Sequence, residues 1–432
     1  MTEKLSSTTL VIFGVTGDLS RRYLLPALSE ICKNSDIRAE LKILGVSRQE
    51  LSVGDVLSGP VKGLAGQFQT FQADYGQTPD YQKLKTKLKA LSSAQTIFYF
   101  AVPPEGVLPI VKNLGKAGLN KADYKLLMEK PFGTDLSSAQ ALINEIQKYY
   151  KEEQVFRIDH YLAKEMAQNI AVFLGSNALF RDVWNRQFIE RIEVIAEEKI
   201  GVEGRGRFYE STGALRDFLQ SHLLQLAALT LMEPCPDVFD FSEVQSRRLA
   251  ALKKLKVDAG SAVIGQYQGY KEEVGNPNSK TETFVALTLK SDSPTWQGVP
   301  ISLVTGKNLS QKLTEIRVFF KKSQSAQANL LRLRVQPKEG IEIELWVKKP
   351  GYEQDLQMLP LDFNYQQYFD HLPDAYEQVI VDAIRGRANL FASSAEVLAS
   401  WEILQPLLDK WDSLKLKTYK PSSTIEDVLK NT

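Results

Sequence analysis

Cysteine and histidine are scarce in this chain of 432 residues, and their scarcity excludes several classes of site. The two cysteines, Cys32 and Cys235, are too few for a disulfide framework or a four-cysteine zinc site. The three histidines, His160, His222 and His371, leave little material for a histidine-rich metal site. We therefore expect no metal centre.

Long apolar runs and an excess of one charge are also lacking. No run approaches the roughly 18 consecutive apolar residues of a membrane-spanning helix. The apolar run 10–15 leads directly into a glycine turn, so we interpret it as a strand and not as a signal peptide. Lys and Arg number 53 against 52 Asp and Glu, which argues against a nucleic-acid binder on global charge. We expect a cytoplasmic protein with no membrane or nucleic-acid partner.

The remaining composition is that of an ordinary globular protein. Hydrophobic residues make up 43% and charged residues 24% of the chain, which is enough for a sizeable core. At roughly 150 residues per domain, the length predicts two or three domains.

The first part of the chain alternates apolar segments with helical patterns. Strands are expected at 10–13, 41–46, 96–102 and 125–128, and helices at 24–32, 81–91, 107–114 and 136–150. Strands that alternate with helices predict a parallel, doubly wound sheet.

The rhythm changes after about Arg157. Helical patterns occupy 162–174, 215–231 and 382–411, and strand patterns occupy 284–289, 301–304, 315–320, 330–335 and 341–347. Consecutive strands without intervening helices predict an antiparallel sheet and hence an α+β domain.

A glycine turn follows the first strand in the segment 10–28, which reads LVIFGVTGDLSRRYLLPAL. Gly14 and Gly17 lie in the turn, and Asp18 opens the following helix. Glycines let backbone N–H groups approach a pyrophosphate at a helix N-terminus. This G-x-x-G pattern is shorter than the usual dinucleotide fingerprint, so an ordinary turn is the alternative.

The end of the second strand indicates which nucleotide would bind. It reads Gly45-Val46-Ser47-Arg48 and lacks the carboxylate that binds the ribose hydroxyls of NAD. Ser47 can donate a hydrogen bond and Arg48 can bind a phosphate in bidentate fashion. We therefore predict NADP, with a solvated surface arginine as the alternative.

Two segments carry cations that suit a phosphorylated substrate. The segment 156–165 reads FRIDHYLAKE. If a helix begins near His160, then His160 and Lys164, four residues apart, lie on the same face of the helix near its N-terminus and can contact a phosphate. Lys130 follows the fourth strand, and Pro131 restricts its backbone. The alternative for Lys164 is a solvated lysine on a helix, and the alternative for Lys130 is an exposed lysine in a loop.

One histidine stands at the edge of an apolar helical stripe. In the segment 215–231, LRDFLQSHLLQLAALTL, His222 is flanked by leucines at helical spacing. A histidine can accept a proton near neutral pH when a carboxylate orients it. The alternative is a packed core histidine.

Together these segments resemble the glucose-6-phosphate dehydrogenase family. The matching stretches include GVTGDLSRRYLLPAL, GVSRQE, EKPFGTDL, FRIDHYLAKEMAQNI, RDFLQSHLLQ, SKTETFVAL and TWQGVPISLVTGKNLSQKLTEIRVFF, in the family's order over nearly the whole chain. The resemblance implies oxidation of D-glucose 6-phosphate at C1 to 6-phospho-D-glucono-1,5-lactone, with hydride transfer to NADP. This is the first step of the oxidative pentose phosphate pathway.

The resemblance also implies residue roles. His222 matches the proton acceptor for the C1 hydroxyl, and Asp159 matches the carboxylate that orients it. The substrate-binding matches are Lys130, His160, Tyr161, Lys164, Glu198, Asp217, Lys307 and Lys312. The cofactor-binding matches are Gly14, Thr16, Gly17, Asp18, Leu19, Ser47, Arg48 and Lys130.

The fold implied by the resemblance agrees with the pattern of elements. A Rossmann-type α/β domain is expected at 1–156, and an α+β domain with a large, mainly antiparallel sheet at 157–432. The second domain would bind substrate and form the interface of a homodimer or homotetramer.

Several residues depart from the family pattern. Ala163 stands where glycine is usual, Val304 where arginine is usual, and the segment 391–396 (FASSAE) lacks an arginine. Some animal members use arginines at the last two places for a second, structural NADP, so we predict no such site.

Two other functions remain open on the sequence alone. Sugar and inositol oxidoreductases also carry an E-K-P segment, but they oxidise unphosphorylated sugars, usually with NAD. A non-catalytic NADP-binding paralogue is the second alternative, motivated by the departures above.

Overall fold

The computed structural model of the protein describes residues 6–235, 241–322 and 327–430. The chain forms two compact units. The first comprises 1–133, 137–163 and 373–394, and the second comprises 134–136, 164–372 and 395–432. The chain thus returns to the first unit near its C-terminus, which a single boundary at 156/157 does not describe.

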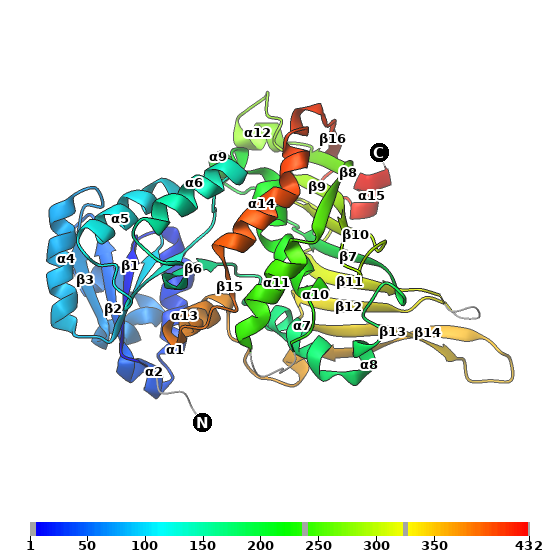
Figure 1. Cartoon of the computed structure of the whole chain (residues 1–432), viewed down its shortest axis with the longest axis horizontal. Helices are drawn as coiled ribbons and strands as arrows, with labels where there is room; N and C mark the ends of the chain where they lie inside the picture. Colours follow the sequence, from blue (N-terminus) through cyan, green and yellow to red (C-terminus); the bar gives the residue numbers. More distant parts are fainter. Residues whose placement is uncertain (1–5, 236–240, 323–326, 431–432) are drawn as a thin grey trace. The chain divides into compact units, whose positions relative to one another are not determined.

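A seven-stranded sheet forms the centre of the first unit, in the order β15-β6-β5-β4-β1-β2-β3 (Figure 1). The strands are β1 (Thr8–Phe13), β2 (Leu41–Ser47), β3 (Phe68–Gln72), β4 (Gln95–Phe100), β5 (Tyr124–Met128), β6 (Val155–Ile158) and β15 (Phe391–Ala392). The two-residue strand β15 pairs antiparallel with β6, and the other neighbours pair in parallel. The expected doubly wound sheet is confirmed.

Helices cover both faces of this sheet. They are η1 (Ser20–Leu24), α1 (Leu25–Ile31), α2 (Ser35–Glu40), α3 (Val53–Val56), η2 (Gly59–Gly66), α4 (Thr78–Leu91), α5 (Pro104–Lys116), α6 (Leu136–Gln147), η3 (Glu152–Gln154) and α13 (Ala375–Arg385). Alternate residues of a strand point to opposite faces. Leu10 and Ile12 accordingly pack with α1, α2 and α13, whereas Val11 and Phe13 pack with α4, α5 and α6.

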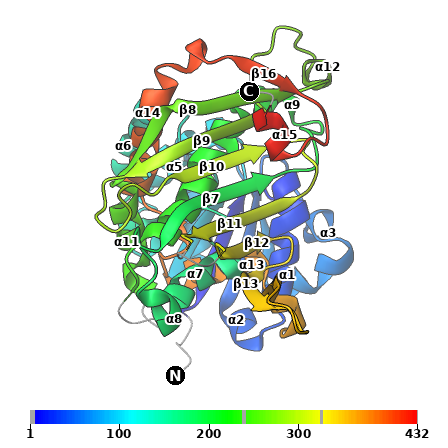
Figure 2. The ribbon, with the colours of Figure 1, turned by 90° about the vertical axis from the view of Figure 1, so that its right-hand side faces the viewer.

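The second unit is built on a nine-stranded sheet in the order β14-β13-β12-β11-β7-β10-β9-β8-β16 (Figure 2). The strands are β7 (Ile189–Glu197), β8 (Leu255–Tyr267), β9 (Phe284–Ser291), β10 (Ile301–Gly306), β11 (Leu313–Phe320), β12 (Leu330–Gln336), β13 (Gly340–Lys348), β14 (Leu356–Asn364) and β16 (Leu416–Tyr419). β10 runs parallel to β7, and β16 parallel to β8, while the other neighbours are antiparallel. The sheet is therefore mixed, with the expected antiparallel pairing predominating.

The helices of the second unit lie on both faces of its sheet. They are α7 (Glu165–Ser176), α8 (Ala178–Arg181), α9 (Gly206–Glu210), η4 (Leu215–Leu223), α10 (Leu224–Leu231), η5 (Phe241–Glu243), α11 (Val244–Leu252), α12 (Tyr270–Val274), η6 (Tyr365–Gln367), α14 (Ser394–Leu408), η7 (Trp411–Ser413) and α15 (Ile425–Lys430). Helix η4 packs on β7, β9 and β10. The short helix α15, in front of the sheet in Figure 2, packs on it through Ile425 and Val428.

The expectation of one continuous helix over 382–411 is wrong. Helix α13 ends at Gly386, which takes the left-handed conformation (φ 72°) that glycine adopts without strain. Phe391 and Ala392 then pair with β6 before α14 begins at Ser394. The glycine cap of α13 and the pairing of Phe391 and Ala392 with β6 thus separate two helices where the pattern predicts one.

Candidate functional site

The turn after β1 brings backbone to the carboxyl edge of the first sheet. β1 pairs with β2 on one side and with β4 on the other, so the strand order reverses there. In open parallel sheets, ligands bind outside the carboxyl ends of the strands at such a point. Gly14 has a φ of 82°, and a Cβ atom there would lie 2.2 Å from the carbonyl oxygen of Ala101. Only glycine fits this position.

The residues of the turn that follow Val15 are partly or fully exposed to solvent. Gly17 donates its N–H to the carbonyl oxygen of Gly14 at 2.9 Å, which closes the turn. Thr16 and Asp18 are exposed, and Leu19 is half-buried. The Asp18 carboxylate lies 3.4 Å from the Arg22 guanidinium, an exposed pair one helical turn apart. The predicted nucleotide residues of this turn are therefore at least partly accessible to solvent.

A cation stands at the end of β2. Ser47 is buried, and its Oγ accepts the N–H of Gln49 at 3.2 Å. The Arg48 side chain is exposed, and the described residues offer its guanidinium no ion-pair partner. This charge is available for a phosphate group, and no carboxylate occupies the strand end. The residues present therefore fit NADP better than NAD.

His160 is held by a half-buried carboxylate, Glu129, that the sequence reasoning passed over. The Nε2 of His160 lies 3.2 Å from Oε2 of Glu129, and the Tyr99 hydroxyl donates to the other oxygen. Burial raises the pKa of Glu129, but the His160 ring and the Tyr99 hydroxyl outweigh it, so the pKa lies below its usual value. The ring of Tyr376 lies 4.1 Å from that of His160. Glu129 could have been found beside Lys130 in the E-K-P segment.

Asp159 forms a turn and not the start of a helix. Its Oδ1 accepts the N–H of Tyr161 at 2.9 Å, and its carbonyl oxygen accepts the N–H of Leu162 at 3.1 Å. Such side-chain bonds compete with helix formation. Helix α7 therefore begins at Glu165, and the expectation that His160 and Lys164 share a helical face is wrong.

Lys164 precedes α7 with an extended backbone. Its Nζ lies 4.0 Å from Oε1 of Glu339, whose other oxygen accepts the N–H of Met166 at 2.8 Å. Glu339 thus satisfies the helix start and partly neutralises the lysine. Lys164 belongs to the second unit, whereas Asp159, His160 and Tyr161 belong to the first.

Two predicted substrate residues form an ion pair at one end of the second sheet. Glu198 follows β7 and Lys307 follows β10, and these strands run parallel with Glu197 opposite Gly306. The Nζ of Lys307 lies 2.5 Å from Oε2 of Glu198, and 5.2 Å from the centre of the Tyr209 ring. The parallel register therefore sets a buried cation against a carboxylate that remains partly exposed.

The loop beyond this pair carries the last predicted lysine. Lys312 lies directly before β11 and is exposed. Its neighbour Gln311 donates to Oε1 of Glu197 at 2.8 Å, which fixes the loop to the end of β7.

Helix η4 carries Asp217 and His222 in π-helical winding. The N–H of Leu224 bonds the carbonyl oxygen of Leu219, a five-residue step that also separates Asp217 from His222. π-Helical segments occur often at functional sites. His222 is 4% exposed and its ring meets the Phe218 ring edge-on at 5.1 Å.

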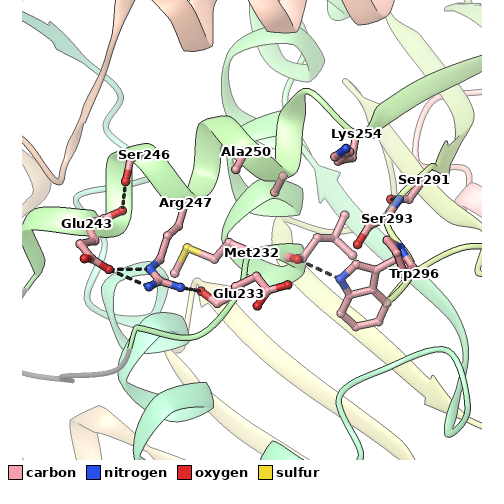
Figure 3. Close-up of a pocket in the computed structure, with 13 residues that line it drawn as sticks. Met232, Glu233, Glu243, Ser246, Arg247, Ala250, Lys254, Ser291, Ser293 and Trp296 are labelled. Carbon is pink, nitrogen blue, oxygen red and sulfur yellow. Dashed lines mark hydrogen bonds and ion pairs between the residues drawn. The ribbon is translucent and has the colours of Figure 1, made fainter.

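A cavity of about 500 Å³ lies elsewhere in the second unit, between α10, α11 and the loop after β9 (Figure 3). Arg247 bonds Glu243 at 2.7 Å and the carbonyl oxygen of Pro234 at 3.0 Å, and Trp296 donates to the carbonyl oxygen of Leu231 at 2.8 Å. Its lining includes none of the residues predicted from the sequence.

Within 6–235, 241–322 and 327–430, no cluster of three or more His, Cys, Asp or Glu side chains could hold a metal ion. No helix in these ranges is long and apolar enough to cross a membrane.

Comparison with known proteins decides the family. Two family models cover almost the whole chain: glucose-6-phosphate dehydrogenase, NAD binding domain, over residues 11–169, and the C-terminal domain of the same family over residues 171–429. The chain belongs to the glucose-6-phosphate dehydrogenase family.

Relatives and solved structures agree with this membership. Glucose-6-phosphate 1-dehydrogenase of Chlamydia muridarum is 35% identical over 94% of this chain and 90% of its own length. A solved glucose-6-phosphate dehydrogenase in complex with glucose-6-phosphate is 30% identical, with a TM-score of 0.91 and coverage of 100% and 99%. The enzyme from Mycobacterium avium is also 30% identical, with a TM-score of 0.85 and coverage of 97% and 95%.

A more distant likeness concerns the fold alone. The 3-ketoreductase KijD10 from Actinomadura kijaniata is 13% identical to this chain, with a TM-score of 0.54 and coverage of 96% and 99%. The fold is therefore shared with this 3-ketoreductase, while the family models cover almost the whole chain and assign it to the glucose-6-phosphate dehydrogenase family.

Proposed function

We propose that this chain oxidises D-glucose 6-phosphate at C1 to 6-phospho-D-glucono-1,5-lactone with NADP as the hydride acceptor. Membership of the family, with matching models over both parts of the chain, is the observation that carries this function. The non-catalytic alternative has no observation of this structure in its favour.

The cofactor residues are proposed from the first unit. Gly14, Gly17 and the start of the following helix would hold the diphosphate, because glycines let backbone N–H groups approach it at a helix N-terminus. Arg48 would hold the 2′-phosphate, with Ser47, Thr16, Asp18, Leu19 and Lys130 completing the site. When bound, the nicotinamide supplies the hydride acceptor.

The substrate residues are proposed to bind different parts of glucose 6-phosphate, according to the chemistry of their side chains. His160, Tyr161 and Lys164 would bind the phosphate group. Glu198 and Asp217 would accept hydrogen bonds from the sugar hydroxyls, because each carboxylate oxygen has two lone pairs. Lys130, Lys307 and Lys312 would supply the remaining donors, and the Lys307–Glu198 pair at 2.5 Å supports a preformed site.

The proton is proposed to pass to His222. As hydride leaves C1, the C1 hydroxyl becomes acidic, and a neutral imidazole can take its proton. Asp159 would orient the ring and stabilise the imidazolium.

A homodimer or homotetramer formed through the large sheet is proposed as the working assembly. Strand β14 is an edge of that sheet, and Leu345, Leu356, Leu359 and Leu361 of the β13–β14 hairpin are 40–61% exposed. Exposed apolar groups on an edge favour an interface. A cytoplasmic location is proposed from the likeness to the cytoplasmic isoform of Solanum tuberosum, 32% identical over 96% of this chain. We also propose no nucleic-acid or membrane partner.

Initial rates test the proposal directly. Purified protein is given glucose 6-phosphate or glucose, each with NADP or NAD, and the absorbance of the reduced nicotinamide is followed. We expect rapid reduction of NADP with glucose 6-phosphate. Folded protein that binds NADP but turns over neither sugar would support the non-catalytic alternative.

A further inference from the structure

A buried glutamate stands at the start of the helix that carries Asp217 and His222. Glu282 is 2% exposed, and its Oε1 accepts the N–H of Leu215, the first residue of η4, at 2.9 Å. Its carbonyl oxygen accepts the N–H of Ala214 at 3.0 Å. The first N–H groups of a helix have no partner within the helix. Glu282 therefore anchors the beginning of η4 by both its side chain and its backbone.

The next residue in the chain anchors the lysine of the Glu198–Lys307 pair. The carbonyl oxygen of Thr283 accepts the N–H of Lys307 at 2.8 Å. The Tyr419 hydroxyl lies 2.9 Å from Oγ1 of Thr283 and donates to the carbonyl oxygen of Lys307 at 2.6 Å. Two consecutive residues, 282 and 283, thus connect the start of η4 with the end of β10. All of these groups belong to the second unit.

The fit of the carboxyl group depends on a glycine. Gly213 has a φ of 66°, and a Cβ atom on it would lie 2.4 Å from Oε1 of Glu282. Burial raises the pKa of Glu282 to about 7, while the Leu215 N–H and the nearby Arg216 lower it. At neutral pH the carboxyl group of Glu282 is therefore only partly ionised, and it can accept the Leu215 N–H whether or not it carries a charge.

We propose that Glu282 is a positioning residue, which holds the first turn of η4 so that Asp217 and His222 keep their places relative to the Glu198–Lys307 pair. The proposal rests on the proposed function for the roles of these residues. Asp217 lies in the first turn, two residues after the anchored N–H, whereas His222 lies further along a buried helix. Loss of the anchor is therefore expected to disturb Asp217, and with it sugar binding, more than it disturbs proton transfer.

The decisive variant is Glu282→Ala, compared with Glu282→Gln. In Glu282→Ala we expect the KM for glucose 6-phosphate to rise by about tenfold and kcat to fall by only about threefold, with the KM for NADP unchanged, because Asp217 is the residue displaced. Glu282→Gln keeps an oxygen that can accept the Leu215 N–H, so its KM should stay within about twofold of the wild type. Equal losses in both variants would overturn the assignment to this hydrogen bond.

A matched control separates positioning from stability. Glu396 is another buried glutamate of the second unit, and it bonds the Arg248 guanidinium at 2.8 Å. Glu396→Gln should lower the melting temperature and leave both KM values unchanged. If it raised the KM for glucose 6-phosphate as much as Glu282→Ala, the effect would be one of general stability and the proposal would fail.

Two further measurements test the anchoring role, and the first of them does not depend on the reaction. Hydrogen–deuterium exchange of the amides of 214–222 should accelerate in Glu282→Ala, and unchanged exchange would overturn the anchoring role. Gly213→Ala should raise the KM for glucose 6-phosphate as Glu282→Ala does, because its Cβ displaces the carboxyl group. A wild-type chain that does not oxidise glucose 6-phosphate would contradict the proposed function, whereas an active chain with an unaltered KM in Glu282→Ala would contradict only this inference.

Discussion

The glycine turn of the first unit and helix η4 of the second unit position their functional groups in opposite ways. In the turn, a side chain is missing: the backbone at Gly14 is packed so closely that a Cβ atom would lie 2.2 Å from the carbonyl oxygen of Ala101. Around η4, side chains are bonded to other groups: Glu282 bonds Leu215, and Lys307 bonds Glu198. We therefore expect the turn to be disturbed by substitutions that add atoms, and η4 to be disturbed by substitutions that remove polar groups.

The largest effect is expected on the η4 side of this comparison. His222→Asn should reduce kcat by about 10³- to 10⁴-fold, because the imidazole that takes the proton is lost. The KM for glucose 6-phosphate should change little, since asparagine retains a polar group of similar reach. Steady-state kinetics measure both, with His371→Asn as the control histidine. Turnover that survives in His222→Asn would contradict the assignment of the proton acceptor.

On the turn side, Gly14→Ala should weaken NADP binding by on the order of a hundredfold. Alanine adds the Cβ atom that has no room and strains a backbone at φ 82°. Equilibrium binding of NADP by fluorescence gives the measurement. Gly63→Ala is the matched control, because a Cβ atom at Gly63 meets nothing within 4 Å. Similar losses in both variants would show that the turn does not act by close approach.

A smaller and more selective effect is expected at the end of β2. Arg48→Ala should weaken NADP by about tenfold or more and leave NAD nearly unchanged, because only NADP carries the 2′-phosphate. The ratio of kcat/KM for the two cofactors is the quantity to measure, and Arg38→Ala is a control for the loss of an exposed arginine in the same unit. An equal loss for both cofactors would remove the 2′-phosphate role.

The sequence predicts the four strands β1, β2, β4 and β5 of the first sheet, because each contains a short apolar run. β1 is buried at every position, so a short apolar run suffices to find it. The sequence reasoning missed the other three strands of this sheet: β3 mixes polar and aromatic residues, and β6 and β15 are buried but only four and two residues long. Among the strands missed in the second sheet, β14 is exposed along most of its length, and β8 is half-exposed over much of its own. Their stability comes from pairing with neighbours, which a local pattern does not contain.

The candidate site shows the same limit. Asp159, His160 and Lys164 are visible in one segment, but the Asp159 side chain makes a turn that local helical spacing does not reveal. The Glu198–Lys307 pair joins residues 109 positions apart and depends on the parallel register of β7 and β10. Without the family resemblance, no local signal would have brought these two residues together.

The last expected effect is on stability and not on binding or turnover, and it tests the η4 side of the comparison, because Glu282 at the start of η4 titrates. The pKa of Glu282 is raised from 4.5 to about 7 in the folded chain. A raised folded pKa gives stability that is fully present below pH 4.5 and is lost as the pH rises through about 7. The wild type should therefore lose stability over this range relative to Glu282→Gln, by at most ~3 kcal/mol. Melting temperatures of both proteins across these pH values measure the difference, and parallel curves would show that Glu282 does not titrate with folding.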